Sequence, residues 1–197
     1  MNWLDLVTTL IEENKGVLRT SDALKAGVSK PTLANLVRNG HLERIAHGQY
    51  VLAAEFPDEL YIWQQRISKM IYSHETALFL HDISERTPFQ QSVTIPSNTK
   101  LPKTFRAGYK VYYVKPELFD LGVTHLPSKM GHQVEAYNLE RTICDVLRSR
   151  NRIDDQILLA TMKQYSVMPN KDLGRLREYA EAFRVMKVLR MYLEVLL

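Results

Sequence analysis

The chain has 197 residues, 45% of them hydrophobic, as in a folded protein with its own core, and a formal net charge of +4 that permits an acidic partner without requiring one. Its single cysteine, Cys144, excludes an intramolecular disulfide and a zinc site built on several cysteines, and we expect it to be a small core residue. The acidic N-terminus is unlike a secretory signal, and no apolar run approaches the ~20 residues of a membrane helix, so we expect a cytoplasmic protein without membrane contact.

The start of the chain predicts two helices. Residues 2–13 carry apolar side chains at helical spacing, and their expected core side holds Trp3, Leu6, Val7 and Leu10. A second helix should end at Ala26-Gly27 and begin near residue types that accept the free N–H groups of a helix start, namely Thr20, Ser21 and Asp22.

A third helix is expected from about Lys30 to Asn39. Ser29 is its N-cap, and Pro31 lies in its first turn, where a missing N–H costs little. Its buried stripe would hold Leu33, Leu36 and Val37. The opposite face is then small and polar, with Thr32 and Ala34 at the margins of Pro31, Asn35 and Arg38.

Two short strands should follow this helix and meet at His47-Gly48, where Gly48 supplies the positive φ of a tight hairpin turn. Helix, turn, helix and hairpin in this order are typical of a winged helix-turn-helix. In residues 15–50, six lysines and arginines stand against two acids, so the basic charge follows this module. The sequence therefore predicts duplex DNA as a ligand.

The candidate DNA contacts come from the third helix and the hairpin. Slim or hydrogen-bonding side chains fit the major groove, and Asn35 suits adenine while Arg38 suits guanine or a phosphate. Ser29 and Lys30 suit the DNA backbone, with Thr32 beside them; in the hairpin the candidates are Arg44, His47 and Gln49. The alternative is that the same helices and hairpin bind a protein.

The stretch SKPTLANLVRNGHLERIAHGQYVL closely resembles the N-terminal winged helix of the AbiEi-type antitoxins of bacterial abortive-infection toxin–antitoxin pairs, which act in phage defence. The wing of that family usually carries a basic residue, then Gly, any residue and Tyr. This chain has His47-Gly48-Gln49-Tyr50, so a histidine stands at the place of a permanent cation.

Residues 57–197 predict a larger α+β domain, with the boundary near Phe56. Helix caps are expected at Asp58, Ser73 and Asn138, and β-branched and aromatic residues in 90–137 indicate a small sheet. A further helix should cover Asp154 to Val167. The final helical segment starts at Asn170, and its apolar stripe shifts after Glu181, which predicts a break there.

The runs SHETALFLHDISERTP and YNLERTICDVLR resemble the C-terminal antitoxin domain of the same family. The resemblance implies a winged domain, residues 1–56, that represses its own operon by binding inverted repeats in the promoter. It also implies an antitoxin domain, residues 57–197, that neutralises a partner toxin resembling a nucleotidyltransferase. Antitoxin and toxin of such pairs need not form a stable complex.

A second cationic surface is expected near the C-terminus. Arg184, Lys187 and Arg190 fall at i, i+3 and i+6, opposite the apolar stripe of the last helical segment. This face is either solvated or a second DNA-binding face that helps to hold or bend the operator.

Catalytic chemistry finds no support in the sequence. His74 and His81 are seven residues apart, too far along a helix to share one metal, and we expect surface or cap roles for both. Glu140, Asp145, Asp154 and Asp155 are the only acids grouped closely enough to suggest a metal-dependent nuclease, and the first two do not share a helix face. We therefore expect no catalytic residues, no metal and no cofactor. The alternatives are a DNA-targeting enzyme, nuclease or modifier, and an adaptor that uses the winged domain for protein contacts.

Overall fold

The computed structural model describes residues 2–14, 16–53, 58–67, 69–84, 86–101 and 103–196. The chain divides into two compact units, Met1–Ser68 with Lys129–His132, and Lys69–Ser128 with Gln133–Leu197. The expected domain boundary near Phe56 lies outside the described residues, so the division into 1–56 and 57–197 stays a prediction. Within the described ranges, no helix combines the length and apolar character needed to cross a bilayer.

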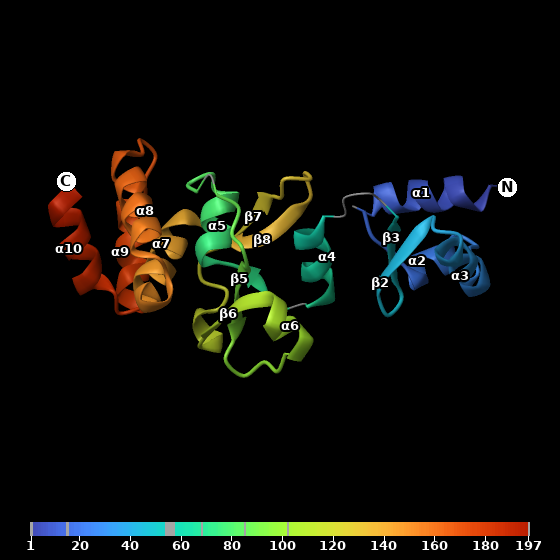
Figure 1. Ribbon diagram of the computed structural model, residues 1–197, viewed down its shortest axis with the longest axis horizontal. Coiled ribbons are helices and arrows are strands. Elements are labelled where there is room, and N and C mark those ends of the chain that lie inside the picture. The colour runs from blue at the N-terminus through green and yellow to red at the C-terminus, as the bar shows by residue number, and fades with distance from the viewer. Residues whose placement is uncertain are drawn as a thin grey trace. The chain divides into compact units, whose positions relative to one another are not determined.

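The first unit combines helices with a three-stranded antiparallel sheet of order β1-β3-β2. Figure 1 shows its hairpin, β2 and β3, together with helices α1, α2 and α3. Its elements are α1 Trp3–Glu13, β1 Leu18–Arg19, α2 Thr20–Lys25, α3 Lys30–Arg38, β2 Leu42–Ala46, β3 Gln49–Leu52 and α4 Glu59–Arg66. The predicted winged helix-turn-helix is confirmed. Its core joins α1, both helices of the pair and the sheet through Val7, Ile11, Leu18, Ala23, Val28, Leu33, Leu36 and Leu42.

Some details of this unit differ from the expectation. Strand β1 was not predicted, because a strand of two residues is too short to show an alternating pattern of polar and apolar side chains. Helix α2 begins at Thr20, but its N-cap residue is Arg19 and no side chain caps it. In α1, Val7 is buried and Leu6 and Leu10 pack against the core as expected, whereas Trp3 is 39% exposed and Ile11 is buried in addition.

The second unit contains a mixed five-stranded sheet of order β6-β5-β4-β8-β7. The strands are β4 Ile71–Tyr72, β5 Gln91–Pro96, β6 Tyr109–Val114, β7 Val123–Pro127 and β8 Gln133–Tyr137. The helices are α5 His74–Leu80, α6 Lys103–Gly108, α7 Leu139–Arg148, α8 Asp155–Val167, α9 Leu173–Ala182 and α10 Met186–Leu196, with short 3-10 turns at Pro116–Leu118 and Arg150–Arg152. Helices α7 to α10 gather at one end of the unit, beside the sheet (Figure 1).

Several boundaries of this unit follow the prediction, but the final helical segment starts at Leu173 with Asp172 as its cap, not at Asn170, and Ser73 precedes α5 without a side-chain cap hydrogen bond. Asn138 caps α7 by accepting the N–H of Arg141 at 3.0 Å, and the helical segment breaks after Ala182. In the first unit, Asp58 caps α4 in the same way by accepting the N–H of Tyr61 at 3.2 Å. Strand β4 was not predicted, because it has only two residues, Ile71 and Tyr72, and both are buried.

A buried guanidinium connects several elements of the second unit. Arg141 on α7 is fully buried between the rings of Tyr137 and Phe183, whose centroids lie 3.9 and 4.0 Å from its Cζ. It donates to Asp145 at 3.0 Å and to the carbonyl oxygens of Leu118 and Leu121 at 2.9 and 2.6 Å. These contacts join α7 to β8, to the segment before β7 and to the residue that follows α9.

Replacing Arg141 should therefore destabilise the protein strongly. Arg141→Met removes these hydrogen bonds and leaves the buried Asp145 carboxylate with Arg148 alone, at 3.4 Å, so we expect a loss of about 3–5 kcal/mol in unfolding free energy. Urea unfolding measures it. Arg177→Met, which breaks the exposed pair with Glu181, is the matched control, at about 0–1 kcal/mol. Equal losses in the two variants would contradict this role of Arg141.

His74 is a second buried polar residue, and the expectation of a surface or cap position for it is wrong. It has no exposed surface and a φ of 49° at the first position of α5. Its ring nitrogens lie 2.9 Å from the Ser73 hydroxyl and 3.1 Å from the Ser149 hydroxyl, and its ring stacks on Tyr112. Burial holds the pKa of His74 well below its ordinary value of 6.5, and Arg148 lowers that pKa further.

This burial makes stability fall in acid. Below pH 6.5 the unfolded chain binds a proton at His74 that the folded chain does not, so the unfolding free energy should drop by about 1.4 kcal/mol per pH unit from this residue alone. His74→Asn keeps a residue that tolerates positive φ and should make the dependence shallower by one proton. Urea unfolding at several pH values measures it, with His125→Asn on the surface as the control. An unchanged slope in His74→Asn would contradict it.

Candidate nucleic-acid interface

The local sequence fixes both ends of α3. The Ser29 hydroxyl accepts the N–H of Thr32 at 3.2 Å and lies 2.8 Å from the Thr32 hydroxyl. Gly27 and Gly40, with φ of 85° and 74°, form the turns on either side. Ser29 is thus the predicted N-cap, and the hydroxyls of Ser29 and Thr32 already bond to each other at the helix start.

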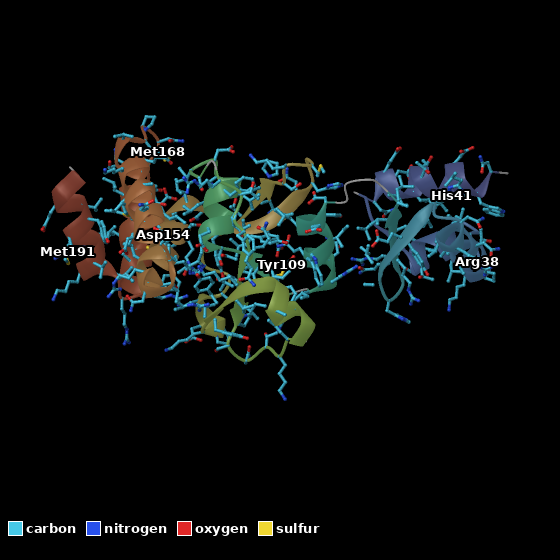
Figure 2. All side chains as sticks on the ribbon, viewed as in Figure 1. Arg38, His41, Tyr109, Asp154, Met168 and Met191 are labelled. Atoms are coloured by element: carbon cyan, nitrogen blue, oxygen red, sulfur yellow. The ribbon has the colours of Figure 1, made fainter. Side chains whose placement is uncertain are left out.

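The two faces of α3 are those that the sequence predicts. Leu33 is fully buried and Leu36 is 9% exposed, whereas Lys30, Asn35 and Arg38 are exposed. Arg38 lies on the outer side of α3 (Figure 2). Among the residues that the structure describes, no acid pairs with Lys30 or Arg38, so α3 presents two free cations and one free amide to solvent.

The hairpin that follows is held against α2. Gly48 has a φ of 70°, its carbonyl accepts the N–H of Thr20 at 2.8 Å, and a Cβ at this position would lie 3.1 Å from the Thr20 hydroxyl. Arg44 bends over the turn, where its guanidinium donates to the Ala46 carbonyl at 3.3 Å and lies 3.2 Å from Nδ1 of His47. Arg44 and His47 together form an exposed, nitrogen-rich hairpin tip.

Gln49 is placed differently from the other predicted contacts. It is half-buried, its amide donates to the Gln65 carbonyl at 3.5 Å, and its side-chain oxygen is buried without a hydrogen-bond partner in the described part of the chain. Sequence reasoning missed Arg19, which is exposed on β1 and lies opposite Gln49 of β3. The signal for Arg19 was absent because β1 itself was not predicted.

The C-terminal cations do not lie on one helix. Arg184 has a φ of 57° in the break between α9 and α10, whereas Lys187 and Arg190 are on α10. The expectation of one continuous helical face through all three is therefore wrong, because the chain turns at Arg184. All three side chains are exposed.

Several of the groups considered for catalysis have structural partners. Cys144 is buried in the core as expected, and burial raises the pKa of its thiol to about 12. Glu140 accepts from the Tyr165 hydroxyl and the N–H of Asp172, both at 3.2 Å. Among the described residues, no three His, Cys, Asp or Glu side chains gather in a way that could hold a metal ion.

Comparisons with known proteins fit the arrangement of the first unit. Residues 5–53 match the family described as "Transcriptional regulator, AbiEi antitoxin". No curated protein sequence matches the chain. Among solved structures, the chain is similar to the Rv2827c protein of Mycobacterium tuberculosis, with a TM-score of 0.68 and 13% identity over 98% of this chain and 78% of that one. This likeness concerns the fold alone. The family match covers the helix-turn-helix and its wing, so the N-terminus of this chain carries an AbiEi antitoxin transcriptional-regulator domain over residues 5–53.

Proposed function

We propose that this protein is the antitoxin of a toxin–antitoxin pair in phage defence: its winged domain represses its own operon by binding inverted repeats in the promoter, and its second domain neutralises a nucleotidyltransferase-like toxin. The observation that carries the DNA-binding half is the outward face of α3, where Asn35, Lys30 and Arg38 are exposed and, among the described residues, unpaired next to the hairpin. A regulator needs such a face to enter a major groove.

The dimensions of this surface suit duplex DNA. An α-helix with its side chains is about 10–12 Å across, which fits the ~12 Å width of the major groove, and the nine residues of α3 give it a length of roughly 13 Å. Arg38 and Asn35 are then base readers, and Lys30, Ser29 and Thr32 at the helix start hold the DNA backbone. Arg44 and His47 at the hairpin tip, and Arg19 on β1 opposite Gln49, meet phosphates or the minor groove. Gln49 has only a minor part in this proposal, because its amide is engaged within the unit.

The antitoxin half rests on the family of the N-terminal domain and on the resemblance of the second domain. The second unit has a large core of its own, built from α5, β6 and α7 to α10, so it forms a compact unit distinct from the winged one. We propose that the protein acts in the cytoplasm, where both the promoter and the toxin are present. A stable complex with the toxin is not required.

A single cellular experiment tests both halves. The full chain is expressed with the neighbouring gene product, and growth and a promoter fusion are followed together. We expect growth arrest without this protein, rescue with it, and repression of the fusion. Arg38→Ala should relieve repression while it still rescues growth, because the two tasks use different units. If the wild-type protein neither represses nor rescues, the proposal is wrong.

The two cations of α3 should behave differently in binding. Arg38→Ala should weaken binding to the promoter duplex by roughly 1–3 kcal/mol and relax base preference, because the variant no longer reads a base edge. Lys30→Ala should weaken binding to promoter and scrambled duplexes alike and reduce the salt slope, because one phosphate is no longer neutralised. Titrations with both duplexes at several salt concentrations measure this. A change of base preference in Lys30→Ala alone would reverse the two roles.

We also propose that Lys187 and Arg190 on α10, with Arg184 beside them, form a second phosphate-binding surface. Replacing all three by alanine should lower the salt slope of promoter binding by roughly 0.9 for each phosphate that these side chains neutralise. The matched control is the triple change of Lys163, Arg175 and Arg177, which are also exposed in this unit. An unchanged affinity and salt slope in the first triple variant would mean that these cations are only solvated.

A further inference from the structure

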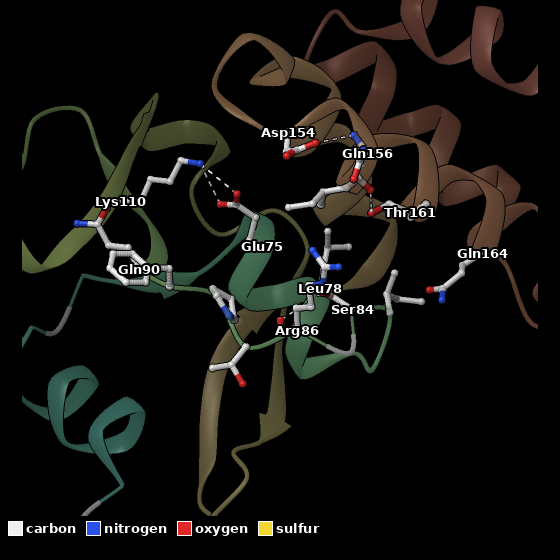
Figure 3. Close-up of a pocket in the computed structure, with 16 residues that line it drawn as sticks. Glu75, Leu78, Ser84, Arg86, Gln90, Lys110, Asp154, Gln156, Thr161 and Gln164 are labelled. Carbon is white, nitrogen blue, oxygen red and sulfur yellow. Dashed lines mark hydrogen bonds and ion pairs between the residues drawn. The ribbon is translucent and has the colours of Figure 1, made fainter.

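The second unit contains an open cleft of about 700 Å³, bounded by α5, the segment that follows α5, and α8 (Figure 3). This volume lies within the range of about 300–1,000 Å³ that is usual for ligand sites. Leu78, Ile83 and Ile157 give the cleft an apolar part. Neither DNA binding by the first unit nor the cationic surface on α10 uses this cleft.

Helix α8 lines one wall of the cleft with polar side chains at regular intervals. Gln156, Ala160 and Gln164 are four residues apart and share one face of the helix. The side-chain amides of Gln156 and Gln164 make no hydrogen bond to any described residue, and Ala160 leaves space between them. Each free amide is able to donate and to accept.

The opposite wall adds further polar groups and one free cation. Ser84, Thr87 and Gln90 line it, and Gln90 donates to the Ala107 carbonyl at 3.3 Å, which leaves its own oxygen as an acceptor. The charge of Lys110 is balanced by Glu75, whose two oxygens both lie 3.1 Å from it, as Figure 3 shows. Arg86 is exposed and has no acidic partner within the described ranges.

Phe89 marks the rim of the cleft. Its relative exposure is 109%, so the ring is fully open to solvent while it borders the cleft. An aromatic ring left uncovered at the edge of a partly apolar cleft is typical of a residue that gains burial when a partner binds.

These features fit an extended polypeptide. Such a chain presents N–H and C=O groups along its length, and the amides and hydroxyls of the two walls match both kinds of group. The distance from Gln156 to Gln164 is roughly 12 Å along the helix, enough for about four extended residues. A nucleic-acid strand fits poorly, because Glu75 and Asp154 border the cleft and Arg86 is the one unpaired cation among its described lining residues.

We propose that this cleft binds a short extended segment of the partner toxin, with an acidic side chain of that segment opposite Arg86 and an apolar one against Phe89. This inference rests on the proposed function and adds the site and the chemistry of the toxin segment. Binding at a cleft of this kind is compatible with a transient encounter between antitoxin and toxin.

The test uses the full chain and two neighbouring positions of α8. Ala160→Trp fills the cleft, and Leu159→Trp, at an exposed position outside the lining, is its matched control. With the neighbouring gene product as the toxin, Ala160→Trp should raise the amount of antitoxin needed for half-maximal growth rescue by roughly tenfold or more, and Leu159→Trp should leave it unchanged. Arg86→Glu, a surface change, should act in the same direction as Ala160→Trp. Thermal unfolding of each variant distinguishes a loss of rescue from a loss of folding.

A photo-crosslinking amino acid at Ala160 or at Leu159 identifies the occupant. We expect the first to crosslink to a short acidic segment of the toxin and the second to give no such product. If the wild-type chain rescues growth but Ala160→Trp and Arg86→Glu rescue equally well, or the crosslink goes to nucleic acid, the cleft assignment is wrong and the antitoxin function stands. If the wild-type chain does not rescue growth, both proposals are wrong.

Discussion

The burial of Leu33 and Leu36 is the constraint that decides which face of α3 is exposed. These side chains enter a core shared with α1, α2 and the sheet, and a helix that buries one side has no choice about the side it exposes. The exposure of Lys30, Asn35 and Arg38 therefore follows from the packing of Leu33 and Leu36. The proposed DNA contacts are thus carried by a helix that is packed into the core, which is the kind of support that a precise binding surface needs.

The winged domain was largely predictable because its signals are local. Ser29, Pro31 and the glycines at 27, 40 and 48 each set a turn or a cap through their own backbone chemistry, and the hydrophobic spacing of α3 fixed its two faces. The failures have the same origin. Strand β1 is too short to carry a pattern, and the direction of the Gln49 side chain depends on a partner sixteen residues away, at Gln65. Arg19 was missed together with its strand.

The structure of the second unit was harder to predict from the sequence, because the contacts that hold its buried polar residues join positions far apart in the chain. The sequence gives no sign that Arg141 is buried, and Asp145 was considered only as a candidate metal ligand, yet the fold places both in its interior, with Arg141 between aromatic rings. His74 was expected at the surface because one of its partners, Ser149, lies 75 residues away in the sequence. The cleft beside α8 has no sequence signal at all, since Gln156 and Gln164 alone indicate only a solvated helix face. Helices and their caps follow from neighbouring residues, whereas buried polar networks and clefts follow from the fold.

The attachment of the hairpin to α2 has a thermodynamic consequence. The Gly48 carbonyl is tied to the N–H of Thr20, β3 is flanked by β1 and β2, and Arg44 is already folded over the turn. A flexible loop loses conformational entropy when it binds a partner, and each side chain that becomes immobilised then costs about 0.5–1.5 kcal/mol of binding free energy. In this hairpin these contacts already restrict the backbone and Arg44 in the folded protein. The hairpin is therefore preorganised, and binding a ligand would cost it less conformational entropy.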